Sequence, residues 1–107
     1  MVERAVKLAV EAYLNTLRDN GVPVRMGIIF GSQTKGTAHQ WSDIDLLVVS
    51  PRFDNMRDRQ DINLLWRIAA QTDGRIEPIL CGEKQWLEDD SSAIIEVARR
   101  EGEIVSM

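Results

Sequence analysis

The stretch GSQTKGTAHQWSDID, residues 31–45, joins two apolar runs that read as neighbouring strands. Residues 24–30, VRMGIIF, are typical of a buried strand, and residues 44–49, IDLLVV, indicate a second one. The polar connection at 33–41 leaves little room for a crossover helix. We therefore expect a loop or one helical turn there, and an antiparallel pair of strands. This pairing brings the end of the first strand beside the start of the second.

Periodicity and turn residues predict the rest of the chain. Apolar residues at helical spacing indicate a first helix ending near 20–21, a second over about 57–72, and a last helix that Gly102 ends. A third strand over 75–81 contains Pro78, which favours the edge of a sheet. The order predicts an α/β (α+β) fold with a small mixed sheet of about three strands and helices packed on it.

Each long helix should bury one apolar stripe. The expected inward residues are Val2, Val6, Ala9, Val10, Tyr13, Leu14 and Leu17 in the first helix, Ile62, Leu65, Trp66 and Ala69 in the second, and Ile94, Ile95 and Ala98 in the last. We also expect a short helix within 82–87, an N-cap at Ser91 or Ser92, and an extended tail at 103–107. The charged run at 52–61 reads as a solvated face.

Composition narrows the class of protein. The 107 residues fit a single domain, 1–107, and 44% hydrophobic residues suffice for a core. The net charge of −4 argues against broad nucleic-acid binding, which needs a basic face. A single cysteine, Cys81, is expected to be a buried thiol in a reducing, cytoplasmic compartment. No apolar run reaches the roughly 18 residues of a membrane span, and the charged, amphipathic N-terminus is unlike a secretory signal.

Two aspartates open the second strand on the same face. Strand side chains alternate, so Asp43 and Asp45 point the same way, about 7 Å apart along the strand. Such a pair repels itself unless a cation lies between, and Mg²⁺ is commonly held by one or two carboxylates plus substrate phosphates. Taken alone, an Asp-x-Asp pair is more often a solvated strand end, a turn or a helix cap.

A third carboxylate favours the metal interpretation. Glu77 lies in an otherwise apolar strand, and a parallel third strand would begin at the same end of the sheet as the second. The alternative is an edge-strand charge that discourages aggregation. Gly31 would let a phosphate approach the backbone, and Ser32 with the following amides could donate to its oxygens. Lys35 would add a point charge, or is an ordinary surface lysine.

These residues resemble a known family. Gly31-Ser32, a ten-residue connection and Asp43-x-Asp45 are similar to the signature of nucleotidyltransferases related to DNA polymerase beta. The stretch GSQTKGTAHQWSDIDLLVV looks like the minimal nucleotidyltransferase branch, whose members are small stand-alone domains. Glu77 departs mildly from the aspartate that many relatives have there. Close similarity covers the first two strands, and the order of elements covers nearly the whole chain.

The resemblance implies a Mg²⁺-dependent nucleotidyl transfer. Asp43, Asp45 and Glu77 would bind two Mg²⁺ ions, Gly31 and Ser32 would hold the triphosphate, and Glu77 could accept a proton from the acceptor hydroxyl. It also implies a helical partner of the HEPN class. In that case the chain is an antitoxin that transfers AMP from ATP to a tyrosine of a toxin.

Other readings stay open. The chain could neutralise its partner by contact alone, with a weak or inactive site, or could modify small molecules as antibiotic-modifying nucleotidyltransferases do; the lack of an acceptor-binding domain disfavours the latter. His39 is expected to be solvated and Trp41 to pack in the loop, with nucleotide contact as the alternative for each. Trp66 reads as core, whereas Trp86, if exposed, could anchor a partner.

Overall fold

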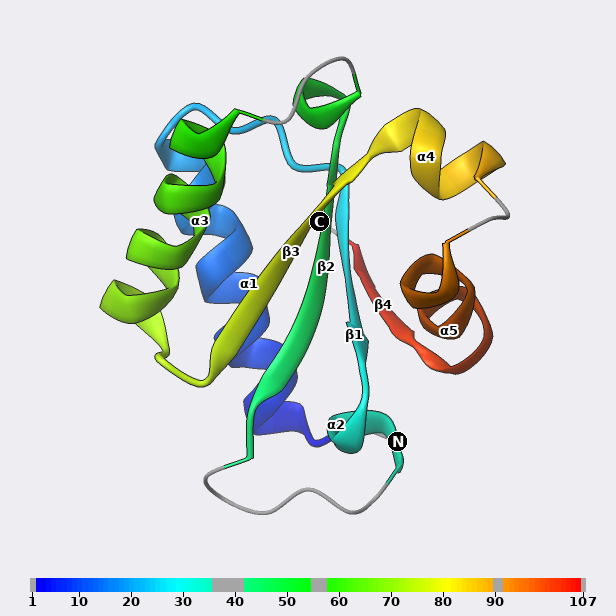
Figure 1. The fold of residues 1–107 in the computed structure, drawn as a ribbon. Helices are drawn as coiled ribbons and strands as arrows, with labels where there is room; N and C mark the ends of the chain where they lie inside the picture. The colour runs from blue at the N-terminus through cyan, green and yellow to red at the C-terminus, as the bar shows by residue number, and fades with distance from the viewer. Residues whose placement is uncertain (1, 36–41, 55–57, 90–91, 107) are drawn as a thin grey trace.

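The fold is a mixed sheet with helices on both faces (Figure 1). The computed structural model describes residues 2–35, 42–54, 58–89 and 92–106. Its elements are α1 (Arg4–Asp19), β1 (Met26–Phe30), α2 (Ser32–Lys35), β2 (Ile44–Ser50), the 3₁₀ turn η1 (Pro51–Phe53), α3 (Arg59–Thr72), β3 (Ile76–Gly82), α4 (Glu83–Glu88), α5 (Ala93–Glu101) and β4 (Glu103–Ser106).

The sheet order is β3-β2-β1-β4. β1 and β2 are antiparallel and β2 and β3 are parallel, which confirms both predicted directions. β3 is an edge strand, as Pro78 indicated. The described sheet has four strands, not the predicted three, because β4 pairs with β1 through a register that places Ile104 opposite Ile28. β2 pairs with only one edge of β1, so the residues expected as an extended tail pair with the other edge and form β4.

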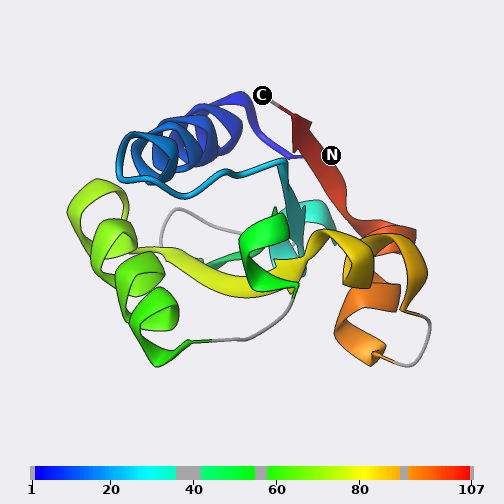
Figure 2. The same cartoon turned by 90° about the horizontal axis from the view of Figure 1, so that it is seen from above.

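Alternation along the strands builds two hydrophobic clusters. One face of the sheet packs under α1 and α3 through Ile29, Leu46 and Val48. The opposite face packs against α5 through Ile28, Leu47 and Val49. Figure 2 shows these helices on either side of the strands. Both faces of β2 are therefore buried, as its continuous apolar sequence indicated.

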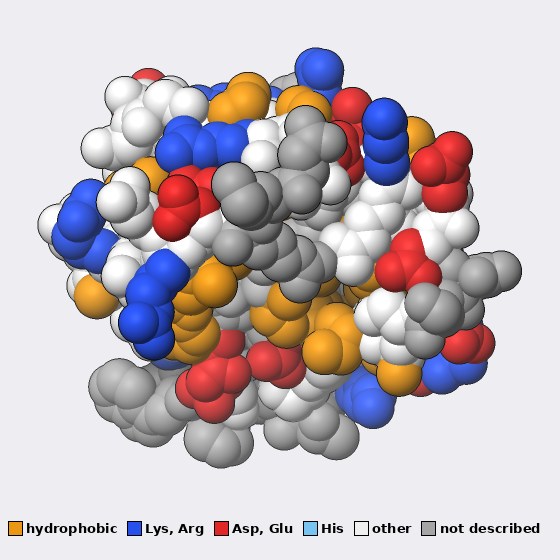
Figure 3. All heavy atoms as spheres, turned by 45° about the horizontal axis from the view of Figure 1, so that its top comes forward, with side chains coloured by type: hydrophobic (Ala, Val, Ile, Leu, Met, Phe, Trp, Pro, Cys, Tyr) orange, Lys and Arg blue, Asp and Glu red, His pale blue; other side chains and the backbone are white. Residues whose placement is uncertain are grey.

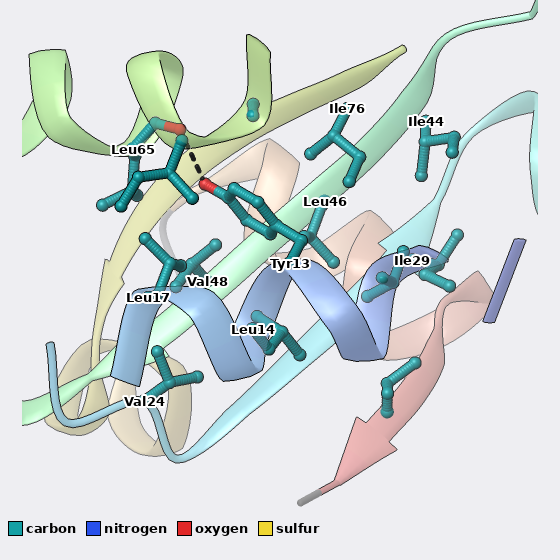
Figure 4. Close-up of a cluster of buried hydrophobic side chains, with 14 of the residues drawn as sticks. Tyr13, Leu14, Leu17, Val24, Ile29, Ile44, Leu46, Val48, Leu65 and Ile76 are labelled. Atoms are coloured by element: carbon teal, nitrogen blue, oxygen red, sulfur yellow. Dashed lines mark hydrogen bonds between the residues drawn. The ribbon is translucent and has the colours of Figure 1, made fainter. Parts of the chain in front are cut away.

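Tyr13 ties the two helices of the larger cluster together (Figure 4). Its side chain is fully buried, and its hydroxyl donates a hydrogen bond of 2.9 Å to the carbonyl oxygen of Leu65. Burial also raises the pKa of the Tyr13 hydroxyl. The bond satisfies a polar atom that would otherwise be costly inside the core.

The predicted stripe of α3 was partly wrong. Leu65 and Ala69 are buried, but Ile62 is 39% and Trp66 46% exposed, and Ile68 faces inward instead. Ile62 and Trp66 form a row on α3 next to the buried row that faces α1 and β3. Because both rows are apolar, hydrophobicity alone did not show which one is buried. In α5, Ile95 and Ala98 are buried as expected, whereas Ile94 is 47% exposed.

The charged run at 52–61 is not wholly solvated. Asp61 is buried, and its Oδ1 lies 2.7 Å from the Nη2 atom of Arg52. Trp86 is half-buried against the smaller cluster, with the guanidinium of Arg99 5.5 Å from its ring centre. Cys81 is buried, as expected. Among the described residues no helix has the length and apolar character needed to span a bilayer.

Candidate active site

The predicted carboxylates meet at one end of the sheet. Asp45 lies opposite Phe30 of β1 and opposite Glu77 of β3, so it stands at the centre of the cluster. Asp43 precedes β2 on the same side. Asp45 and Glu77 are half-buried and Asp43 is exposed. The parallel pairing of β2 with β3 therefore brings together the three acidic residues that the sequence singled out.

Their charges act on one another. The pKa of Glu77 is raised, first by burial, then by the negative charge of Asp43 and by interactions with Asp45. Like charges raise the pKa of a carboxyl because ionisation adds repulsion, and a nearby cation would remove that repulsion. The cluster thus has the electrostatic character of a cation site.

Gly31 adjoins the cluster directly. It follows β1 with φ of 77°, a conformation that favours glycine. A Cβ atom at this position would collide with the Oδ2 atom of Asp45. α2 begins at the next residue, Ser32, and the first amides of a helix lack partners within it. The Ser32 hydroxyl and the first amides of α2, which are predicted to hold phosphate, therefore follow directly after the residue that adjoins Asp45, a predicted metal ligand.

Lys35 points toward α5. It is exposed, and its Nζ atom lies 3.9 Å from Oε2 of Glu101. Its contact with phosphate stays a prediction. His39 and Trp41 fall within 36–41, outside the described residues.

Sequence reasoning missed Gln33. This α2 residue is only 6% exposed, and its Nε2 atom donates to the carbonyl oxygens of Ser42 at 3.4 Å and Asp43 at 3.3 Å. A glutamine in a polar connection carries no pattern that distinguishes it from a solvated one. Its importance appears only when α2 packs against β2 and the residues just before it.

The donor chemistry suits a hard divalent cation, since all three side chains offer carboxylate oxygens. As the side chains stand, however, the described part of the chain holds no group of three or more histidine, cysteine, aspartate or glutamate residues that could hold a metal ion. Burial is the largest cause of the raised pKa of Glu77, and the negative charges of Asp43 and Asp45, which a bound cation would offset, add to it. The residues fit the ion by type and location, and their side chains would have to converge on it.

Comparison with known proteins identifies the family. The family described as nucleotidyltransferase domain matches residues 10–100. The chain belongs to this nucleotidyltransferase family. The match spans the three strands β1, β2 and β3 of the site, the one-turn helix α2 and all three carboxylates. The chain is accordingly a transferase enzyme, and the nucleotidyltransferase fold expected from its sequence is confirmed.

Solved structures share the nucleotidyltransferase fold. A toxin–antitoxin structure with AMP-PNP is 22% identical in sequence to this chain and superposes with a TM-score of 0.63. The alignment covers 92% of this chain and 71% of that one. A variant of the toxin–antitoxin MntA-HpeT is 21% identical at a TM-score of 0.61, covering 89% and 70%. A proposed nucleotidyltransferase from Sulfolobus solfataricus is 20% identical at 0.59, covering 92% and 74%. No curated protein matches this nucleotidyltransferase in sequence.

Proposed function

We propose that this nucleotidyltransferase transfers a nucleoside monophosphate, AMP from ATP, to a hydroxyl acceptor with the help of two Mg²⁺ ions. The observation that carries the proposal is the placement of Asp43, Asp45 and Glu77 at one end of the sheet, beside Gly31. Figure 3 shows acidic side chains in the lower part of one face, below a hydrophobic stretch. An anionic triphosphate could approach such acids only together with cations.

Each residue has a role in the proposed reaction. Asp43, Asp45 and Glu77 would hold the ions, while the backbone at Gly31 and the amide and hydroxyl of Ser32 would orient the phosphates. The acceptor oxygen attacks the α-phosphorus, the bond between the α-phosphorus and the bridging oxygen breaks, and pyrophosphate leaves. Glu77, which lies opposite Asp45 on the neighbouring strand, would take the acceptor's proton. Bound Mg²⁺ would stabilise charge on the attacking and leaving oxygens.

The acceptor we propose is a tyrosine of a HEPN-class toxin, with this chain as its antitoxin. Two of the similar structures are toxin–antitoxin assemblies, and one of them carries AMP-PNP. The alternative is neutralisation of the partner by contact alone. A cytoplasmic location, predicted from the single cysteine, belongs to the same proposal.

A labelling assay tests the proposal. The chain is incubated with α-³²P-ATP, Mg²⁺ and the product of the neighbouring gene. We expect label on the partner, loss of label in Asp43→Asn and Asp45→Asn, and loss after chelation with EDTA. Asp19→Asn, which removes an exposed carboxylate from the end of α1, is the matched control and should keep full activity. Neutralisation of the partner that survives Asp43→Asn/Asp45→Asn without any label would establish the contact mechanism instead.

A further inference from the structure

We propose that Gln33 is a positioning residue that holds Asp43 in place for metal binding by tying the backbone of that aspartate to α2. The inference rests on the proposed function, because it concerns a proposed metal ligand. It adds a residue that neither the sequence pattern nor the family match assigns.

The first support is the burial of the Gln33 amide. Gln33, Ser50 and Asp61 are the buried polar or charged side chains among the described residues. A buried amide without hydrogen bonds is unfavourable, so its bonds decide where the side chain lies. Both donor bonds described for Gln33 go to consecutive carbonyl oxygens just before β2, and one of them belongs to Asp43.

The second support is that Asp43 lies outside the described strand pairings of β2. β2 begins at Ile44, whose amide donates to the carbonyl of Arg75 at 2.8 Å. Asp45 is paired across the sheet on both sides, with Phe30 and with Glu77. Asp43 precedes the strand and is exposed. The hydrogen bond from Gln33 is therefore the contact, among those described, that links the Asp43 backbone to the phosphate side of the site.

The hydrogen bonds of Gln33 indicate that it acts on the site through the backbone of Ser42 and Asp43. Nε2 of Gln33 donates to the backbone of Ser42 and Asp43 and the side chain is buried, so its role would be exerted through Asp43. Bonds of 3.3 and 3.4 Å share the amide group between two acceptors and are long for N–H···O contacts. Groups that hold metal ligands in place commonly affect metal affinity by about 10- to 100-fold when removed.

The test measures metal binding directly. Gln33→Met preserves length and burial but removes the donor, and Gln33→Glu replaces the donor with a carboxylate of the same length. Mn²⁺ is titrated into the full chain with α,β-methylene-ATP, which cannot release pyrophosphate, and free Mn²⁺ is followed by electron paramagnetic resonance. Hydrogen exchange of the backbone over 42–46 is measured without metal.

Ser50→Ala is the matched control. Ser50 is buried at the far end of the same strand and donates to the carbonyl of Pro23 at 3.0 Å, so its loss should lower stability without reaching Asp43. We expect both Gln33 variants to weaken Mn²⁺ binding about 10-fold or more and to speed exchange over 42–46. Ser50→Ala should leave Mn²⁺ affinity unchanged.

The outcomes separate this inference from the proposed function. If the unaltered chain binds no Mn²⁺ with the analogue, the proposed metal-dependent function itself fails. If the unaltered chain binds Mn²⁺ and Gln33→Met binds it equally well, or if Ser50→Ala weakens binding as much as Gln33→Met does, only the positioning role of Gln33 is overturned.

Discussion

The backbone of Gly31 lies so close to the carboxylate of Asp45 that a single added methyl group would collide with it. Gly31 directly follows β1 and Asp45 lies near the start of β2, and the two strands are antiparallel. The contact therefore joins the proposed phosphate-binding turn to the central proposed metal ligand. It makes the glycine necessary for two separate reasons, its positive φ and the missing side chain.

Replacing glycines at three positions separates these reasons. Gly21→Ala, with φ of 89° and open space around it, should lose about 1–2 kcal/mol of unfolding free energy from backbone strain alone. Gly31→Ala should lose more and should also lose nucleotidyl transfer. Gly74→Ala, which has neither a positive φ nor a neighbour within 4 Å, should change stability by less than about 0.5 kcal/mol. Urea unfolding and the labelling assay measure both effects; equal losses at Gly21 and Gly31 would contradict the collision.

Glu77 should make the metal-free chain less stable as pH rises. Its pKa is raised in the fold, so the unfolded chain loses this proton at lower pH than the folded chain does. The stabilisation is complete below the unfolded pKa, near 4.5, and is lost as pH rises through the folded pKa. Glu77→Gln should remove this fall while abolishing activity. Urea unfolding in EDTA between pH 4 and 7 checks it, with the exposed Glu88→Gln as control. An unchanged pH slope in Glu77→Gln would refute the prediction.

Tyr13→Phe should cost about 1 kcal/mol near neutral pH, because it removes the hydroxyl that donates to the Leu65 carbonyl. The raised pKa of Tyr13 adds a pH signature. The unfolded chain ionises this tyrosine near its ordinary value of 10.0 while the fold keeps it protonated, so stability is lost as pH rises above that value. Thermal unfolding from pH 7 to 11 should show a shallower alkaline decline in Tyr13→Phe than in the unaltered chain. Parallel curves would show that the Tyr13 hydroxyl does not contribute.

Removing only one partner of the ion pair between Arg52 and Asp61 should lower the free energy of unfolding. Arg52→Ala leaves the carboxylate of Asp61 buried without its guanidinium, and we expect a loss of about 1–3 kcal/mol. Arg52→Ala/Asp61→Leu should recover part of that loss, because no buried charge remains. A double-mutant cycle by urea unfolding measures the coupling, and the exposed Arg67→Ala serves as control on α3. A coupling energy of zero would contradict this account.

The proposed site was predictable in large part because its features are local or follow from strand direction. Face parity placed Asp43 and Asp45 together, and the parallel crossover brought Glu77 to them. The burial phase of α3 was less predictable. Ile62 and Trp66 are as apolar as Leu65 and Ile68, yet the packing of α3 against α1 selected the second pair. The buried positions of Gln33 and Asp61 had no sequence signal, since each depends on a partner that is distant along the chain or outside its own element.

The features that the sequence predicted are those that local backbone geometry determines. Three local properties act within a few residues: the two-residue period of a strand, the 3.6-residue period of a helix, and the turn-forming backbones of glycine, which is permissive, and of proline, whose φ is fixed. The order of elements and the faces of the carboxylates therefore follow from the chain. Contacts between distant segments depend on which surfaces are left open once those elements form. The pairing of β4 with β1, the inward turn of Gln33 and the burial of Asp61 against Arg52 arise at that stage. They are settled by packing and hydrogen bonding across the whole fold.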